Sequence, residues 1–354
     1  EIAQREEANL IIFDDDLTPA QMWNLEKELD LKIIDRSCLI LDIFAGRAKT
    51  KEAKAQVSLA QLKYLLPGLA RKWLHLSRQY GGIGTKGPGE TQLETDRRLT
   101  RKRIKDLEKV LEKIDKEKEN QRKKRLDLFK VALVGYTNAG KSTLFNQLTS
   151  ASASVEEKLF STLDPTTRVV RFPKKQKFVL TDTIGFIRKL PHHLIASFRS
   201  TLDEVRVADL ILHVVDFSHP DFLAQVEKVN QVLEELDSLN KPTLMVYNKI
   251  DKLDGDYSFA SLDQDKDKVF VSAKENLGTD ELIDKIEKQI EEQMTDAVVE
   301  LHNSELHLLP TLHRIGIITE KRFGNEKAKL KIRCRRWELE KMFNSNHKVT
   351  LTFT

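Results

Sequence analysis

Apolar and polar positions alternate along residues 128–294 in a pattern that predicts strands and helices in turn. Short apolar runs predict the strands, and the segments between them repeat their apolar residues at helical spacing. The predicted strands cover residues 129–134, 168–172, 177–181, 210–215, 243–247 and 269–271. This order is typical of a parallel sheet with helices on both faces, so we expect an α/β fold with a doubly wound sheet.

The amino-terminal part predicts a smaller α/β unit. Thr18 can cap a helix, Pro19 suits the first helical position, and Gln21 completes a capping box. Short strands are predicted on either side of this helix, at residues 10–13 and 32–34. Two more helices are predicted after them, at residues 37–44 and 51–66.

A glycine-rich loop and a long helical region come next. Residues 81–89 hold five glycines and one proline, which no regular element tolerates, so a loop is predicted there. From Glu90 the pattern becomes helical and follows the 3,4,3 spacing of a coiled-coil seam, at Ile104, Leu107, Leu111 and Ile114. We expect two long antiparallel helices with a turn between them at residues 115–120.

In the tail, basic and apolar residues alternate over residues 327–335, which predicts a strand with one basic face. Such a strand is either a sheet edge that lysines protect from aggregation or a surface that contacts a polyanionic partner. The whole chain then divides into an α/β subdomain with its glycine-rich loop, a helical hairpin, the doubly wound domain and a small α+β domain. The predicted boundaries are residues 1–88, 89–127, 128–296 and 297–354.

The composition, with 40% apolar and 32% charged residues among 354, is that of a globular protein. Cys38 and Cys334 have no neighbours at metal-ligand or redox spacing, so no disulfide or metal framework is expected. No apolar run approaches the ~18 residues of a membrane span, and we expect a monomeric, cytosolic protein. The net charge of +4 is uneven, because residues 86–130 carry 16 basic and 10 acidic residues, a balance of +6 that leaves −2 elsewhere.

A phosphate-binding loop is predicted where the first strand of the doubly wound domain meets its helix. The pattern G-x-x-x-x-G-K-[ST] needs this strand and helix around it. Its glycines let backbone N–H groups face phosphates, Lys141 neutralises the β and γ phosphates, and the Ser142 hydroxyl ligates Mg²⁺. The loop consists of Gly135, Tyr136, Thr137, Asn138, Ala139, Gly140, Lys141 and Ser142.

Two more segments are expected at the γ phosphate. Asp182 can hold Mg²⁺ through water, and Gly185 can bring its N–H against the γ phosphate. Thr162 is the expected second Mg²⁺ hydroxyl, with Ser161 and Thr166 as alternatives. The first segment, 41 positions after Lys141, is Asp182, Thr183, Ile184 and Gly185, and the second is Phe160, Ser161, Thr162, Leu163 and Asp164. Lys141, Thr162 and Gly185 are the expected catalytic residues.

The base site is predicted after the fifth and sixth strands. The Asp251 carboxylate accepts two hydrogen bonds only from a base edge with two donors, which guanine has and adenine lacks. Opposing adenine's N1 lone pair to this carboxylate costs ~1 to 3 kcal/mol. The first base motif is Asn248, Lys249, Ile250 and Asp251, and the second, which can offer an N–H to guanine O6, is Ser272, Ala273 and Lys274. GTP, GDP and Mg²⁺ are therefore the expected ligands.

These five elements, in this order, resemble a translation-factor-like GTPase domain, which implies the nucleotide at the carboxyl ends of the strands. One departure is Phe186, at the position where a glutamine would orient the attacking water. Phenylalanine cannot hold water by hydrogen bonding. Slow intrinsic hydrolysis, accelerated by a large partner, is predicted.

Residues 81–98, GGIGTKGPGETQLETDRR, are similar to the signature of the HflX family, and FSTLDPT and DTIGF resemble its switch sequences. The resemblance covers the whole chain. It implies a GTPase that binds the large ribosomal subunit and its rRNA and splits stalled ribosomes under stress. The expected contact begins at Gly81 and ends at Lys105, and residues 97–105 hold six basic residues in nine. A solvated coiled-coil surface is the alternative for this charge run.

Two other functions are compatible with these motifs. One is an assembly GTPase that acts on immature large-subunit particles. The other is a GTP-gated binding module in which hydrolysis only releases the partner. Incubation with intact ribosomes separates the first from ribosome splitting, and a non-hydrolysable GTP analogue separates the second.

Overall fold

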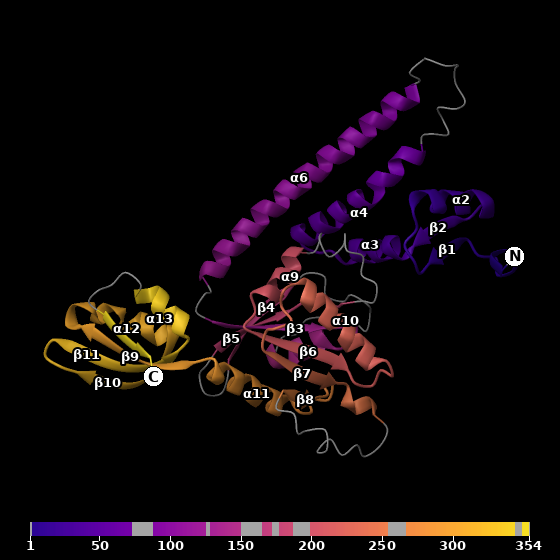
Figure 1. Ribbon diagram of the computed structural model, residues 1–354. Coiled ribbons are helices and arrows are strands. Elements are labelled where there is room, and N and C mark those ends of the chain that lie inside the picture. Colours follow the sequence, from indigo (N-terminus) through magenta and orange to yellow (C-terminus); the bar gives the residue numbers. More distant parts are fainter. Residues whose placement is uncertain are drawn as a thin grey trace.

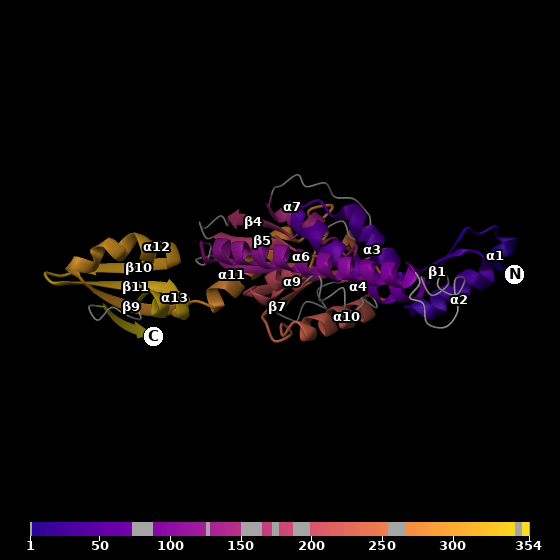
Figure 2. The same ribbon diagram turned by 90° about the horizontal axis from the view of Figure 1, so that it is seen from above.

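The computed structural model describes residues 2–72, 88–124, 128–149, 165–171, 177–186, 199–253, 267–343 and 349–353. Figures 1 and 2 show an amino-terminal part, a central domain and a carboxyl-terminal part in a row. The predicted switch residues 160–164 and residues 81–87 of the predicted glycine loop lie outside the described residues, while the last two loop residues, Pro88 and Gly89, are helical. The predictions made for residues 81–87 and 160–164 therefore stay predictions.

The central domain is built on a six-stranded sheet with the order β4-β5-β3-β6-β7-β8. Strands β3, β5, β6, β7 and β8 are parallel, and β4 is an antiparallel edge strand. The bounds are β3 (Phe129–Gly135), β4 (Thr166–Arg171), β5 (Lys177–Asp182), β6 (Leu210–Asp216), β7 (Thr243–Asn248) and β8 (Lys268–Phe270). All six predicted strands are present with end shifts of one or two residues, which confirms the doubly wound fold.

Helices cover both faces of this sheet, as the alternation of apolar runs predicts. Leu133 and Val214 face α7 (Lys141–Thr149) and α11 (Thr279–Glu292) in one core. Val134 and Ile211 face α9 (Arg199–Arg206) and α10 (Phe222–Glu235) in the other. Because both faces are buried, the parallel strands are mostly apolar along their length. The short helix η1 (Ile250–Lys252) follows β7.

The amino-terminal part begins with α1 (Ile2–Arg5) and the parallel pair β1 (Leu10–Phe13) and β2 (Lys32–Asp35). The predicted capping box is confirmed, since Thr18 and Gln21 cap α2 (Pro19–Leu29) reciprocally. Asp35 caps α3 (Arg36–Arg47), which packs on α4 (Lys51–Lys72). Both predicted strands and all three predicted helices of this part are therefore confirmed.

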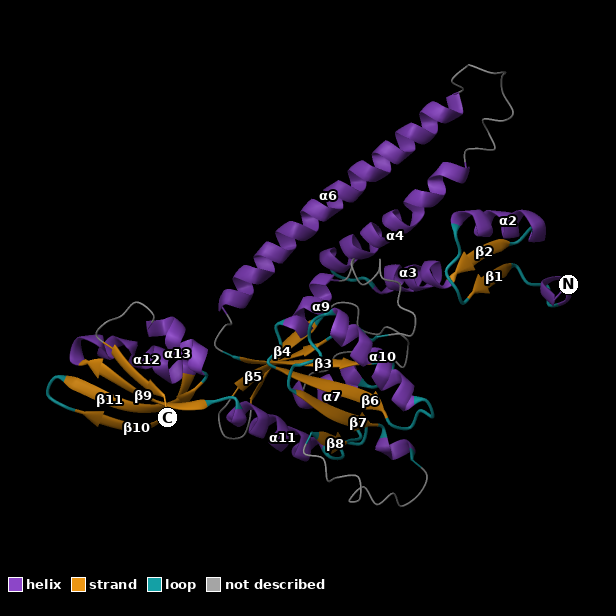
Figure 3. Cartoon of the chain, viewed as in Figure 1, coloured by secondary structure: helices purple, strands orange, loops and turns teal. Residues whose placement is uncertain are grey.

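The turn predicted at residues 115–120 is wrong, because α6 (Pro88–Lys124) continues through it as one helix. Its antiparallel neighbour is α4, as Figures 1 and 3 show. Ion pairs Lys118–Glu52 at 2.6 Å and Lys63–Glu108 at 2.8 Å join the two helices. Alternating charges in this stretch support i, i+4 pairs on a helix surface, so they continue the helix.

The carboxyl-terminal part is an antiparallel sheet with the order β10-β11-β9-β12. Its helices pack on one face, around Val299, Leu330 and Leu339. The strands are β9 (Thr295–His302), β10 (Gly316–Phe323), β11 (Lys327–Cys334) and β12 (Val349–Phe353), and the helices are η3 (Asn303–Leu308), α12 (Leu309–Ile315) and α13 (Arg336–Phe343). The predicted α+β class is confirmed.

Strand β11 is the predicted basic strand, but it is not the sheet edge that one alternative proposed. It lies between β10 and β9. Its cations pair across strands with acidic residues, in the pairs Lys329–Glu300, Lys331–Glu320 and Arg333–Asp296. Hydrogen bonding to the Arg333 guanidinium lowers the pKa of Asp296 from its usual value. These exposed pairs each stabilise the fold little, but they cancel much of the positive charge of the face.

A partly buried contact joins the carboxyl-terminal part to the central domain. The Asp209 carboxylate, just before β6, accepts hydrogen bonds from the Lys130 N–H at 2.8 Å and from Arg335 Nη1 at 3.0 Å. The Arg335 guanidinium also lies over the Phe129 ring, 5.9 Å from its centroid. None of the helices in the described part of the chain has the length and apolar character that a bilayer crossing needs.

Candidate nucleotide-binding site

The predicted phosphate loop lies between β3 and α7, at the carboxyl edge of the sheet. Its backbone is unusual at three positions, since φ is 153° at Gly135, 62° at Asn138 and 93° at Gly140. A Cβ on Gly135 would stand 2.2 Å from the Val214 carbonyl oxygen. Glycine is therefore required there by both backbone conformation and space.

Lys141 is buried under this loop. Its Nζ donates to the carbonyl oxygens of Gly135 at 3.1 Å and Tyr136 at 2.9 Å, which bends the loop around the ammonium group. Burial lowers the pKa of Lys141 to about 8, and the charge of Asp182 opposes that shift. A buried ammonium group is stabilised by a nearby negative charge. Phosphate oxygens supply such charge, so Lys141 is suited to bind them.

Ser142 and Asp182 come together from α7 and the end of β5. The Ser142 hydroxyl donates to Asp182 Oδ2 at 2.7 Å. A hydroxyl and a carboxylate side by side are hard oxygen donors, the kind that Mg²⁺ prefers. The predicted metal residues Ser142 and Asp182 therefore fit this ion, while Thr162, the third, lies outside the described residues.

The D-x-x-G segment is tied closely to the phosphate loop. The Thr183 hydroxyl donates to the Leu133 carbonyl oxygen at 2.6 Å. Phe186 donates its N–H to the Gly135 carbonyl at 3.0 Å and accepts from the Thr137 N–H at 2.7 Å. A Cβ on Gly185 would lie 2.9 Å from Thr137 Cα. Glycine thus allows the two loops to meet.

The side chains of Ile184 and Phe186 point into two different cores. Phe186 is 2% exposed and packs with Val134 and Leu202 of the central domain. Ile184 packs with Ile40 and Phe44 of α3. The buried Phe186 ring presents no hydrogen-bonding group to a water molecule at the phosphate loop, as the sequence predicts.

Truncating Ile184 to alanine is expected to loosen the contact between the D-x-x-G segment and the amino-terminal helices. Ile184 is 6% exposed, and removing a buried isoleucine costs about 2 to 4 kcal/mol. We expect a lower melting temperature of the amino-terminal part by differential scanning calorimetry. Leu223→Ala, at a side chain that is 70% exposed, is the control with little effect. Equal melting of the two variants would contradict this contact.

The base motifs meet the phosphate loop through Asn248. Its Nδ2 donates to the Ala139 carbonyl at 2.9 Å, and its Oδ1 accepts from the Ala273 N–H at 3.0 Å. Asn248 is 2% exposed, so these bonds are shielded from water. One side chain therefore joins the phosphate loop and both base motifs.

Asp251 and Ser272 form the other link between the base motifs. The Ser272 hydroxyl donates to Asp251 Oδ1 at 2.6 Å and accepts from the Glu275 N–H at 3.1 Å. One carboxylate oxygen of Asp251 is thereby fixed, which orients the other. The Ala273 N–H, one of the predicted donors to guanine O6, is engaged by Asn248 in this conformation.

The sequence interpretation missed two residues of β6 beside this site. His213 lies opposite Val134 in the sheet and is 1% exposed. Burial, and then the charge of Lys141, lower the pKa of His213 to about 4, so the ring is neutral. Asp216, at the end of β6, pairs with Lys249. The available signal was two polar residues in an otherwise apolar strand.

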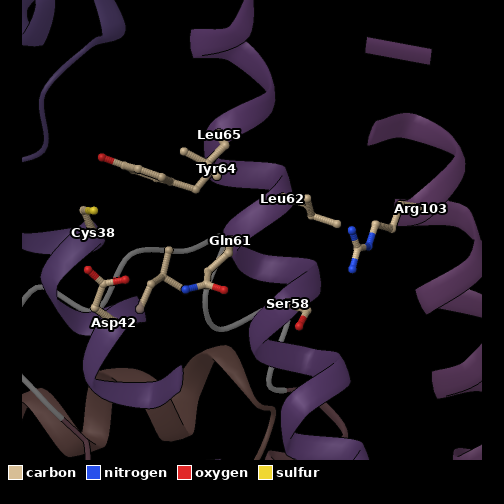
Figure 4. Close-up of a pocket in the computed structure, with 9 residues that line it drawn as sticks. Cys38, Asp42, Ser58, Gln61, Leu62, Tyr64, Leu65 and Arg103 are labelled. Atoms are coloured by element: carbon tan, nitrogen blue, oxygen red, sulfur yellow. The ribbon is translucent and has the colours of Figure 1, made fainter. Parts of the chain in front are cut away.

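A pocket that the sequence did not predict lies away from this site, between α3, α4 and α6, and has a volume of about 340 Å³. Figure 4 shows Cys38 and Asp42 on one side of α4, with Arg103 approaching from the other. Burial, and next the charge of Asp42, raise the pKa of the Cys38 thiol. A protonated thiol is a weak nucleophile, so this pocket has no activated cysteine.

The phosphate loop, the D-x-x-G segment and the two base motifs meet at one edge of a doubly wound sheet, which defines the class of P-loop GTPases. The chain is 47% identical over 335 residues to the GTPase HflX of Magnetococcus marinus, covering 92% of this chain and 77% of that protein. It belongs to the HflX family of GTPases.

Three family models match in succession. The model described as GTP-binding GTPase N-terminal matches residues 1–45, GTP-binding GTPase Middle Region residues 47–125, and 50S ribosome-binding GTPase residues 130–249. Together they follow the order of the parts described above. The predicted family resemblance is confirmed.

Two other relatives, both curated as GTPase HflX, give the same family. The GTPase HflX of Escherichia coli is 44% identical, over 93% of this chain and 78% of that protein. That of Caldanaerobacter subterraneus is 50% identical, and the chain spans only 66% of its length. A solved structure, a GTP-binding protein from Sulfolobus solfataricus in complex with GDP, has a TM-score of 0.48 at 28% identity, covering 80% of this chain and 81% of that chain.

Proposed function

We propose that this chain binds GTP with Mg²⁺, hydrolyses it to GDP and phosphate, and uses this cycle to separate large and small ribosomal subunits. The observation that carries the nucleotide part is Asn248, which bonds to the phosphate loop and to the second base motif at once. This contact fixes the phosphate site and the guanine site relative to each other. Few ligands other than a guanine nucleotide need a phosphate site and a guanine site together.

Each expected catalytic residue has a task in this proposal. Lys141 binds the β and γ phosphates, and the Gly185 N–H donates to the γ phosphate. Ser142 and Asp182 hold Mg²⁺, which when bound neutralises charge between the phosphates. Thr162 is proposed to approach the same ion. Because the Phe186 ring is buried, the chain lacks a water-orienting side chain at this position, and hydrolysis is slow until a partner orders the site.

The proposed partner is the large ribosomal subunit. The central domain matches a model described as 50S ribosome-binding GTPase. The amino-terminal half of α6 adds a basic groove with a volume of about 780 Å³, whose lining includes Arg97, Arg98, Arg101, Lys102 and Lys105. Closely spaced arginines and lysines favour an RNA backbone. The loop from Gly81 is proposed to enter the RNA with this helix.

Co-sedimentation with purified large subunits tests this partner. We expect binding with GTP that weakens with GDP, and multiple-turnover hydrolysis that rises at least tenfold on adding subunits. Incubation of the protein and GTP with intact ribosomes is expected to yield free subunits on a sucrose gradient. Binding to immature large-subunit particles without any splitting of intact ribosomes would support the assembly alternative. One round of splitting with a non-hydrolysable analogue would mean that binding supplies the work.

A charge-matched pair of variants tests the basic groove. Replacing Arg97, Arg98 and Arg101 with glutamine is expected to weaken subunit binding. The slope of log affinity against log salt concentration should fall by the equivalent of up to about three phosphate contacts. The control is the triple glutamine variant of Lys109, Lys113 and Lys116, which are exposed residues further along α6. Equal losses in the two variants would place the contact elsewhere.

A further inference from the structure

The base motif contains a backbone strain that the proposed contacts to guanine do not explain. Lys249 has φ 68° and ψ 33°, the left-handed conformation, although it is not a glycine. This conformation is unfavourable for a residue with a Cβ. Strain of this kind persists only where neighbouring contacts enforce it, and such contacts often serve a site.

An ion pair supplies one such contact. Lys249 Nζ lies 2.7 Å from Asp216 Oδ2, and only 16% and 14% of the two side chains are exposed. Asp216 ends β6 and pairs in register with Asn248, the last residue of β7, and Lys249 directly follows Asn248. Strands β6 and β7 lie side by side (Figure 3). The pair therefore crosses the sheet at the edge where the base motif begins.

The Asp216 carboxylate is itself held rigidly. Its Oδ1 accepts from the Ser218 N–H at 3.2 Å and from the Ser218 hydroxyl at 2.6 Å. The next residue, Phe217, donates its N–H to the Asn248 carbonyl at 2.9 Å. Thus the loop after β6 is bonded to the base motif through both backbone and side chain, and Lys249 meets a fixed anion.

From this geometry we propose that Asp216 is a positioning residue of the guanine site. Asp216 holds the Lys249 side chain stretched along the sheet edge, so that its methylene groups form one preformed wall of the base slot, while Asp251 reads the base edge. A lysine without this anion has to be ordered when the nucleotide binds, which weakens binding. The inference deepens the proposed function and rests on its guanine assignment.

Asp216→Asn is the sharpest test, because the amide keeps an oxygen for Ser218 and removes only the charge. We expect a fluorescent GDP analogue to dissociate about tenfold faster, equivalent to about 1.4 kcal/mol. In steady-state hydrolysis the KM for GTP is expected to rise by a similar factor with kcat unchanged, because the Asp216 carboxylate bonds to Ser218 and Lys249 and to no group of the phosphate site within the described part of the chain. Asp216→Glu, which keeps the charge, should restore part of the affinity.

Asp209→Asn is the matched control. Asp209 precedes the same strand and also holds a largely buried cation, Arg335, at 3.0 Å. It lies just before the first residue of β6, whereas Asp216 is the last. We expect its melting temperature to fall about as much as that of Asp216→Asn, with wild-type GDP dissociation.

The outcomes separate the inference from the function on which it rests. Failure of the wild-type protein to bind GDP would refute the proposed function. If the wild type binds and Asp216→Asn dissociates within twofold of it, the positioning role is overturned. Equal acceleration in Asp209→Asn would also overturn it, since the effect is then general destabilisation. With Lys249→Met as the background, adding Asp216→Asn should cause no further loss.

Discussion

Replacing Gly140 with alanine is expected to abolish GDP binding. The added Cβ would stand 2.1 Å from Asn248 Nδ2, at a backbone φ of +93°. Asn248 cannot move aside cheaply, because it is bonded to Ala139 and Ala273 at its two ends. Losing those bonds and straining the backbone together cost roughly 3 to 6 kcal/mol.

The measurement is a titration with a fluorescent GDP analogue, together with thermal melting. Gly46→Ala is the control, because a Cβ there meets nothing within 4 Å. Gly46 lies inside α3, where alanine is expected to stabilise the helix by about 0.5 to 1 kcal/mol. Wild-type GDP affinity in Gly140→Ala would show that Asn248 does not join the motifs as described.

The central sheet was predictable because each of its strands carries its own signal. Buried parallel strands are largely apolar runs, and the nucleotide motifs stand at the carboxyl ends of four of them, β3, β5, β7 and β8. Since carboxyl ends of parallel strands share one edge, predicting the strands also predicts that Lys141, Asp182 and Asn248 meet. The structure brings these residues together through Ser142 and Ala139.

The helical hairpin shows what periodicity alone cannot decide. The seam residues of α6 predict that this helix packs on another, but they do not name the partner. We expected the partner within residues 89–127, whereas it is α4, which precedes the glycine loop. A charged stretch of helix has the composition of a turn, and in the structure the pairs Lys118–Glu52 and Lys63–Glu108 join this stretch to its neighbour.

Contacts between segments far apart in the chain could not be predicted from the sequence either. Nothing in the D-x-x-G motif indicates that Ile184 packs against α3. Likewise, the alternation in β11 predicts one basic face but not the acidic residues opposite, because these come from β9 and β10 and depend on register. The local pattern fixes which way a side chain faces, and tertiary pairing fixes its charge environment.

Replacing Asp251 with asparagine is expected to change the preferred base from guanine to xanthine. Ser272 donates to Oδ1 of Asp251 at 2.6 Å, so an amide oxygen can keep that place and leave the NH₂ group toward the base. Guanine then presents a donor to a donor, whereas the C2 carbonyl of xanthine accepts. We expect GDP affinity to fall roughly 100-fold, about 2.7 kcal/mol, and XDP to bind more tightly than GDP.

Competition of unlabelled GDP and XDP against a fluorescent nucleotide measures this preference. Asp280→Asn, an exposed residue in the first turn of α11, makes the same charge change away from the base motifs. It should keep the wild-type order. A parallel loss of both nucleotides in Asp251→Asn would contradict base reading by this carboxylate. Gly140→Ala is expected to lose affinity for both GDP and XDP, because it displaces Asn248 and not the carboxylate that reads the base. The two variants therefore separate the assembly of the site from base recognition.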